Sequence, residues 1–458
     1  MEDPSVSVAR LLGEAVTADR YGFEKAVSSW EAVAEDPSID AVSIVVGNAL
    51  HRPIAEALVA AGKHVLCEKP LASSKEDARA MAALEKDANV VTAVGYTYRR
   101  NHTPDPPPAS PLPSRVKESP AMKLGLYNAI LHDRSLPEAI KVIDDVGLTG
   151  IEINTGGFLP AVHVPTFDDI LVSDTARDDF LGIFEGTGVS IAGLNANGNP
   201  LHPNPAIGEK HAEDIRRSIR LAERLGQHRV VTMSGLPGGE PGTVRPNWIV
   251  NAWNSAALDV LDYQWKILAD FWRETDRLAR DHDVKVALEL HPQNVVFNSA
   301  SVHQLIDLTG ATNIGVELDA SHLFWQQMDP VLVVRHLGEL VFHAAAKDVR
   351  INRQHAALNG VLDNSFRRLS SDEPRTNLGG DEWANEWPKE SAWDFVALGK
   401  GHDTAYWTEF LRALYEVDPD MLVNIEHEDT ELGRVEGVAA AAEVLKAADA
   451  ALRESSEA

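Results

Sequence analysis

The sequence predicts an α/β protein, a (β/α)8 barrel preceded by a partial Rossmann-like domain. Short apolar runs of strand length alternate with helical patterns along residues 122–458. Eight such strands and eight helices are the number that closes a parallel barrel. Several of these strands end in acidic side chains and histidines, and the carboxyl ends of barrel strands are where active sites form. The pattern therefore predicts both the fold and the place of a site.

The elements of the barrel follow one another in strict alternation. The expected strands are 123–128, 150–155, 190–196, 229–234, 285–291, 313–319, 341–347 and 422–428. The expected helices are 136–147, 174–186, 209–226, 260–283, 299–309, 329–339, 404–416 and 433–452. The helices 136–147 and 209–226 end at Gly147 and Gly226, and glycine commonly terminates a helix.

A Pro-rich stretch separates the barrel from the first part of the chain. Residues 101–121 are rich in proline and poor in apolar side chains, so we expect an extended linker there. Residues 1–100 form the expected N-terminal domain and residues 122–458 the barrel. In the first part, strands are expected at 41–46, 64–67 and 90–94, and helices near 53–61 and 75–87.

Composition restricts the function. The formal net charge of -27 repels phosphate backbones, so nucleic acid is a poor partner. No apolar run is long enough to span a membrane, and the N-terminus lacks the pattern of a secretory signal. Cys67 is the only cysteine, which excludes an intramolecular disulfide and fits a reducing compartment. We expect a cytoplasmic protein that binds no membrane.

The ends of four strands carry the candidate chemistry. Alternation along each strand predicts that Glu289, Asp319, His343 and Glu426 point into the barrel. Carboxylates buried together repel one another unless a cation neutralises them, and a divalent metal is the usual solution. A set of oxygens with one imidazole favours Mn, Mg or Co over Zn. These four residues are the predicted metal ligands.

Motifs at the same strand ends resemble a known family. They are Leu288-Glu289-x-His291-Pro292, Asp319-x-Ser-His322, Lys347-Asp348, Gly401-His402-Asp403 and Ile425-Glu426-His427-Glu428-Asp429. Residues 122–452 resemble the xylose isomerase-like barrels of sugar phosphate isomerases and epimerases. The resemblance places metal ligands at Glu289, Asp319 and Glu426. The fourth ligand of that family falls at Ala345, so His343, one pleat step deeper, or His402 on a long loop would replace it.

The resemblance also implies a mechanism. A base removes the proton α to a sugar carbonyl, and the resulting enediolate is stabilised by the metal. Glu289 and Glu426 would flank the reacting carbon. His322 would hydrogen-bond a substrate oxygen or be structural. Lys347 would stabilise the enolate or pair with Asp348, and His291 would shuttle a proton or orient a neighbour.

Other polar and aromatic residues are candidates for substrate contacts. Glu152 and Asn195 are expected to touch hydroxyl groups. The long segment 350–403 carries Trp383, Trp387 and Trp393, whose rings would stack on a sugar or form an oligomer contact.

The N-terminal part resembles a second family. Asn48-Ala-Leu-His51 and Gly62-Lys-His-Val-Leu-Cys-Glu68-Lys69-Pro70-Leu71 are similar to the nucleotide-binding half of Gfo/Idh/MocA sugar oxidoreductases. That family places a lysine, here Lys69, near nicotinamide and sugar. No G-x-G-x-x-G motif precedes residue 40, so we expect a truncated domain that binds no NAD, with Lys69 as a vestigial site residue. The alternative is a cofactor site completed by a partner chain.

Three functions remain open from the sequence. The first is a divalent-metal-dependent isomerase or epimerase of a small sugar or keto sugar. The second is a metal-dependent lyase on 3-oxo-glycosides, because the barrel also resembles the large subunit of C-glycoside deglycosidases. The third is a non-catalytic assembly subunit. A second copy of the chain or an oxidoreductase is left open as a protein partner.

Overall fold

The computed structural model describes residues 10–11, 26–27, 29–44, 46, 50–68, 71–72, 74–84, 90–95, 122–362, 364–429 and 431–457. The chain divides into two compact units, Met1–Ser114 and Arg115–Ala458. The expected linker 101–121 and Lys69 lie outside the described residues, and the domain bounds 1–100 and 122–458 stay a prediction.

The first unit contains a small parallel sheet with helices. Its three strands are β3 (Ala41–Ile44), β4 (His64–Glu68) and β5 (Thr92–Gly95), in the order β3-β4-β5. Its helices are α2 (Trp30–Glu35), α3 (His51–Ala60) and α4 (Lys75–Ala83), and β1 (Arg10–Leu11) pairs in parallel with β2 (Ala26–Val27). Ile44, Leu58 and Cys67 belong to its buried core. The expected strands and helices of this part are present, and α2 was not expected.

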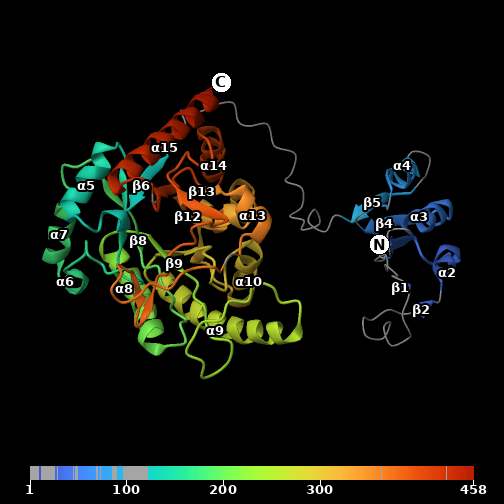
Figure 1. The fold of residues 1–458 in the computed structure, drawn as a ribbon, viewed down its shortest axis with the longest axis horizontal. Coiled ribbons are helices and arrows are strands. Elements are labelled where there is room, and N and C mark those ends of the chain that lie inside the picture. The colour runs from blue at the N-terminus through green and yellow to red at the C-terminus, as the bar shows by residue number, and fades with distance from the viewer. Residues whose placement is uncertain are drawn as a thin grey trace. The chain divides into compact units, whose positions relative to one another are not determined.

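The second unit is the predicted closed barrel of eight parallel strands (Figure 1). The strands are β6 (Lys123–Tyr127), β7 (Gly150–Asn154), β8 (Ser190–Asn195), β9 (Arg229–Met233), β10 (Lys285–Glu289), β11 (Ile314–Asp319), β12 (Val341–Ala346) and β17 (Leu422–Ile425). Pairing of β17 with β6 closes the ring. Most of these strands end before the predicted bound, so several polar side chains lie just beyond a strand rather than within it.

Helices surround the barrel, and the last of them, coloured red in Figure 1, ends near the C-terminus. They are α5 (Leu136–Asp145), α6 (Phe167–Val172), α7 (Asp174–Gly182), α8 (Pro205–Arg224), α9 (Ser255–Asp281), α10 (Ser299–Thr309), α12 (Pro330–Leu337), α14 (Thr404–Val417) and α15 (Arg434–Glu457). The expected helix 329–339 becomes α12 followed by a short 3-10 turn, η5 (Gly338–Leu340). Helix η4 (Asn128–Leu131), α6 and α11 (Ala320–Trp325) were not expected.

Alternation along β10 divides its side chains between two environments. Val286 and Leu288 belong to the large buried core cluster, whereas Ala287 packs in a separate small cluster with Val231 and Phe342. A strand points successive side chains to opposite faces, so Glu289 shares the face of Ala287. Val286 and Leu288 therefore pack on one face of β10, and the carboxylate of Glu289 lies on the opposite face.

The segment after β12 has structure of its own. Strand β13 (Asp348–Ile351) pairs antiparallel with β16 (Trp393–Val396), and α13 (Arg353–Asn359) lies between them in the chain. A second hairpin joins β14 (Asn377–Gly379) to β15 (Glu382–Trp383). The sequence predicted only a long loop here. We call residues 350–403 the lid segment.

Within the described ranges, no helix combines the length and the hydrophobicity that a membrane span requires.

Candidate functional site

Three carboxylates meet at the carboxyl ends of neighbouring strands. Glu289 is the last residue of β10, Asp319 is the last of β11, and Glu426 directly follows β17. One oxygen of each lies within 4.8 Å of the others. Glu289 is 2 % exposed and Asp319 is 0 % exposed, so these charges are shielded from water. The structure thus brings together three of the four predicted ligands.

His322 is the imidazole nearest to these carboxylates. It lies in α11, the short helix that follows β11, and its Nε2 is 3.1 Å from Glu289 Oε1 and 3.3 Å from Asp319 Oδ2. The ring of His291 lies beside it, with the centroids 4.2 Å apart. His291 donates its Nδ1–H to the carbonyl of Pro292 at 2.6 Å, which leaves Nε2 as the nitrogen with a lone pair.

Lys347 supplies the positive charge of the cluster. Its Nζ donates to Glu426 Oε1 at 3.0 Å, and it lies 3.9 Å from Asp319 Oδ2 and 2.9 Å from Glu428 Oε2. The ammonium also lies 4.3 Å from the ring centroid of Phe395, a cation–π contact. Lys347 is 3 % exposed, so it neutralises the carboxylates from within the barrel mouth.

Burial and charge perturb the ionisation of this cluster. Burial raises the pKa of Asp319 to about 7 and also raises the pKa of Glu426 well above its usual range. Burial acts to raise the pKa of Glu289 as well, but the His322 and His291 rings outweigh it and the pKa falls to about 2. The pKa of Lys347 is raised, because the surrounding carboxylates outweigh its burial. One ammonium does not compensate several buried carboxylates, so two of them hold their protons more tightly than usual.

The donor set fits a divalent cation. Asp319 Oδ2 and His322 Nε2 are buried and have no hydrogen-bond partner among the described residues. Buried polar atoms are almost always hydrogen-bonded, so such a pair requires an explanation. Atoms coordinated at about 2.1 Å around one octahedral ion lie about 3.0 Å apart. The distances from His322 Nε2 to the two carboxylate oxygens are close to that spacing.

A cavity of about 620 Å³ opens above the cluster. Its lining includes Tyr127, Asn197, Glu289, Lys347, Phe395 and Glu426. The amide of Asn197 donates to Glu289 Oε2 at 2.6 Å and holds that carboxylate in place. The site therefore combines a charged floor with room for a small organic molecule.

Comparison with known proteins identifies the family. The sequence model of the xylose isomerase-like TIM barrel matches residues 140–448. The chain belongs to this family. The model of the oxidoreductase family with an NAD-binding Rossmann fold matches residues 7–96, so both predicted resemblances are confirmed.

Relatives match each part of the chain separately. The uncharacterized protein YfiH of Bacillus subtilis (strain 168) is 32% identical over 329 residues, which are 71% of this chain and 98% of that protein. Levoglucosan dehydrogenase of Pseudarthrobacter phenanthrenivorans is 42% identical over 103 residues, which are 21% of this chain. The chain spans only 26% of that dehydrogenase. A solved structure of L-ribulose 3-epimerase covers 73% of this chain and 96% of its own, with 15% identity and a TM-score of 0.46.

His343 does not lie with the three carboxylates of this xylose isomerase-like barrel. Its Nε2 is 2.9 Å from Glu152 Oε2, and Glu152, Glu317 and His343 form a separate, deeper group. Asn424 and Asn195 each donate to Glu152 at 2.7 Å. The prediction that His343 ligates the same ion as Asp319 therefore disagrees with its place in the barrel.

The deeper group also corrects the expected role of Glu152 and Asn195. Both are buried, at 1 % and 2 % exposure, and neither lines the cavity above the carboxylates. Gly125 makes room for this layer, because a Cβ there would lie 2.1 Å from Asn424 Oδ1. Burial, together with the nearby Glu152 and Glu289 carboxylates, raises the pKa of Glu317 well above its usual range.

His402, the other candidate for the fourth ligand, is also directed elsewhere. Its Nδ1–H donates to Asp348 Oδ1 at 2.7 Å, and its ring stacks on Phe324 with centroids 3.7 Å apart. Asp348 also accepts the backbone N–H groups of Gly399, Gly401 and His402. Asp348 thus fixes the turn at residues 399–402. Lys347 does not pair with Asp348; its ammonium contacts Glu426 instead.

Sequence reasoning missed two residues of the site. Asn197 follows β8, and its place beyond a strand end is a signal that could have found it. Phe395 lies in β16 of the lid segment and contacts Lys347 and His322. The hydrophobic pattern of the sequence gives no signal for these contacts.

Proposed function

We propose that the barrel is a divalent-metal-dependent isomerase or epimerase that acts on a keto sugar by α-proton abstraction. The observation that supports this most strongly is the convergence of Glu289, Asp319 and Glu426 on one point at the floor of a cavity. The family of the chain fits a sugar substrate. The excess of carboxylates over Lys347 fits a cation in the cluster.

The residues that would hold the cation are Glu289, Asp319, Glu426 and His322. His322 takes the place proposed from the sequence for His343, because its Nε2 contacts two of the carboxylates. When bound, a divalent cation supplies Lewis-acid stabilisation of the negative charge of an enediolate.

The side chains of this chain would position and move the proton. Glu289 and Glu426 come from β10 and from the end of β17, and both line the cavity as candidate bases. Asn197 fixes the orientation of Glu289, and Lys347 does the same for Glu426. His291, which presents a nitrogen lone pair beside Glu289, is the candidate proton shuttle.

A lyase acting on a 3-oxo-glycoside is the second candidate. The size of the cavity favours it, because about 620 Å³ exceeds what a single sugar ring needs and leaves room for a leaving group. Elimination also begins with removal of an α-proton, so the same residues would serve. Product analysis separates the two: an isomerase returns a sugar of the same mass, whereas a lyase releases a fragment.

The test begins with metal analysis of the purified full chain, followed by removal of metal with a chelator and addition of Mn²⁺. The protein is then incubated with D-fructose and with a 3-oxo-glucoside in D₂O, and exchange of the α-proton is followed by ¹H NMR. We expect Mn²⁺-dependent exchange that falls at least 100-fold in Glu289→Gln. Glu339→Gln, an exposed residue of η5, is the control and should keep the rate.

Two results would overturn the proposal. Equal exchange by Glu289→Gln and the unchanged protein would remove Glu289 from the chemistry. Absence of both metal binding and exchange would favour the non-catalytic assembly subunit.

A further inference from the structure

A second cavity adjoins the carboxylate site and is built mainly from aromatic rings. Its volume is about 260 Å³, and its aromatic lining comprises Trp248, Trp325, Phe366, Trp387, Trp393 and Phe395. His291, His322, Trp387 and Phe395 also line the larger cavity, so the two spaces meet beside the carboxylates.

The aromatic wall is held in a fixed arrangement. The rings of Trp325 and Trp393 are stacked, with an interplanar angle of 2° and centroids 4.9 Å apart. Trp387 meets Trp393 edge-on at 4.7 Å, and its Nε1–H donates to the carbonyl of Trp393 at 3.3 Å. The Nε1–H of Trp393 donates to the carbonyl of Val361 at 3.4 Å. Two of the indole N–H groups are thus already used within the protein.

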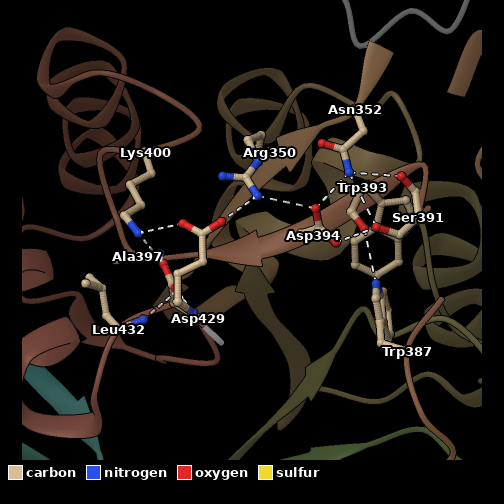
Figure 2. A network of polar contacts seen from close by, with 11 residues as sticks. Arg350, Asn352, Trp387, Ser391, Trp393, Asp394, Ala397, Lys400, Asp429 and Leu432 are labelled. Atoms are coloured by element: carbon tan, nitrogen blue, oxygen red, sulfur yellow. Dashed lines mark hydrogen bonds and ion pairs between the residues drawn. The ribbon is translucent and has the colours of Figure 1, made fainter. Parts of the chain in front are cut away.

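A polar network next to these tryptophans holds the lid segment together and joins it to the loop after β17 (Figure 2). Asn352 donates to Asp394 Oδ2 at 2.7 Å and to the carbonyl of Ser391 at 2.9 Å. Asp429, from the loop after β17, accepts the N–H of Ala397 at 2.8 Å and the Nζ–H of Lys400 at 3.0 Å. The cavity is therefore a preformed feature of the barrel mouth.

The chemistry of the lining decides between two kinds of occupant. A second sugar ring carries several hydroxyl groups, and each loses free energy when it is buried without a hydrogen-bond partner. Ser391 already contacts Asp394, and the indole N–H groups of Trp248 and Trp325, which have no hydrogen-bond partner in the described part of the chain, are buried beneath the cavity surface. The other polar side chains of the lining, His291, Gln293 and His322, also line the larger cavity, so they lie where the two spaces meet and few polar groups face the rest of the aromatic cavity. A flat apolar ring needs no such partners and gains from offset or edge-on contact with aromatic rings. A dry cavity of about 150 Å³ holds benzene, so 260 Å³ accommodates a larger ring system.

We propose that the substrate is a sugar that bears an apolar aromatic ring, with that ring in the tryptophan-lined cavity and the sugar over the carboxylates. This inference rests on the proposed function, because it assigns the sugar to the site of Glu289, Asp319 and Glu426. It names the substrate class that the site selects. The two adjoining cavities match the two parts of such a molecule.

The test compares two ligands that differ only in the ring, phenyl β-D-glucopyranoside and methyl β-D-glucopyranoside. Binding of each to the Mn²⁺-loaded full chain is measured by isothermal titration calorimetry. We expect the phenyl glucoside to bind at least 10-fold more tightly, and Trp387→Ala to reduce that ratio to below 3-fold. Trp383→Ala is the matched control, because Trp383 lies in the same lid segment, is also 38 % exposed and lines neither cavity.

Leu362→Gln provides a second variant that does not disturb the core. Leu362 lines the aromatic cavity and is 56 % exposed, so the substitution should leave folding intact and still weaken phenyl glucoside binding selectively. Equal affinity of the unchanged protein for the two glucosides would overturn the inference. A dimer that dissociates on Leu362→Gln in analytical ultracentrifugation would also overturn it, because this face would then bind a second copy. These binding results are independent of proton exchange, so the two proposals fail separately.

Discussion

Replacing Asp319 by Asn isolates the charge of one carboxylate in the cluster. Asp319 Oδ1 accepts the N–H of Ser321 at 2.8 Å and caps the start of α11. Asparagine caps a helix as well as aspartate does and has nearly the same volume. The substitution therefore removes a negative charge while it keeps the local structure.

The pKa of Asp319 sets the size and sign of the expected effect. Its pKa in the folded protein is about 7, against an ordinary value of 3.8. Between these values the folded state binds more protons than the unfolded state, so stability falls as pH rises. The difference corresponds to up to about 4 kcal/mol, reached above pH 7, at about 1.4 kcal/mol per pH unit. In chelator at pH 8, Asp319→Asn should therefore be more stable than the unchanged protein.

Urea unfolding at pH 5 and pH 8, followed by tryptophan fluorescence, checks this prediction. All the tryptophans except Trp30 lie in the barrel unit, so the signal reports the barrel. The stability gain of Asp319→Asn should be larger at pH 8 than at pH 5, and addition of Mn²⁺ should reverse the order of the two proteins. Asp329→Asn, which keeps an exposed cap of α12 and removes only its charge, is the control and should leave the response to Mn²⁺ unchanged. A variant that is less stable than the unchanged protein in chelator at pH 8 would refute the reasoning.

Three further substitutions test other parts of the structure. Asp429→Asn should lower stability at pH 7 by about 2 kcal/mol, because hydrogen bonds to Ala397, Lys400 and the loop outweigh burial and lower the pKa of Asp429 to about 2. That difference should shrink as pH falls from about 4 to 2, and equal urea midpoints at pH 7 would contradict it. Gly437→Ala should destabilise the barrel by about 1–3 kcal/mol, because a Cβ at this position would lie 2.0 Å from His427 Nε2. A Cβ at Gly433 meets no atom closer than 3.8 Å, so Gly433→Ala is the control, and thermal unfolding compares the two variants. Lys347→Met should lower the melting temperature in chelator, because the buried carboxylates lose the ammonium that neutralises them. Addition of Mn²⁺ should raise the melting temperature of this variant more than that of the unchanged protein. An unaltered melting temperature in chelator would argue against this role of Lys347.

The barrel could be predicted because its signals are local. In Val286–Leu290 and Ile314–Asp319, apolar residues alternate with residues of the opposite face, and glycines such as Gly226 mark where helices end. Strand ends in a parallel barrel meet at one rim, so the convergence of Glu289, Asp319 and Glu426 could also be predicted. These inferences need only the period of the pattern and the direction of the strands.

The period showed that His343 lies one pleat step deeper than Ala345, but it could not show whether an imidazole at that depth still reaches the carboxylates. His343 has an inward face, as predicted, but it pairs with Glu317 rather than with Asp319, in a register that shifts between β11 and β12. His322 was expected to contact a substrate oxygen or to be structural, and only the turn of α11 places its Nε2 close to two carboxylates. Register and helix direction depend on packing against neighbouring elements, which no single segment encodes.

The sequence by itself determined the alternation of strands and helices, the acidic rim and the resemblance to two families, because these are properties of short segments and of motif spacing. Only the tertiary structure decided which imidazole accompanies the carboxylates and how the lid segment forms an aromatic cavity beside them. Trp325 of α11 stacks on Trp393 of β16. Strand β16 is held in place by its pairing with β13, which follows barrel strand β12. Contacts between residues so far apart in the chain depend on the closed barrel, which brings their elements together.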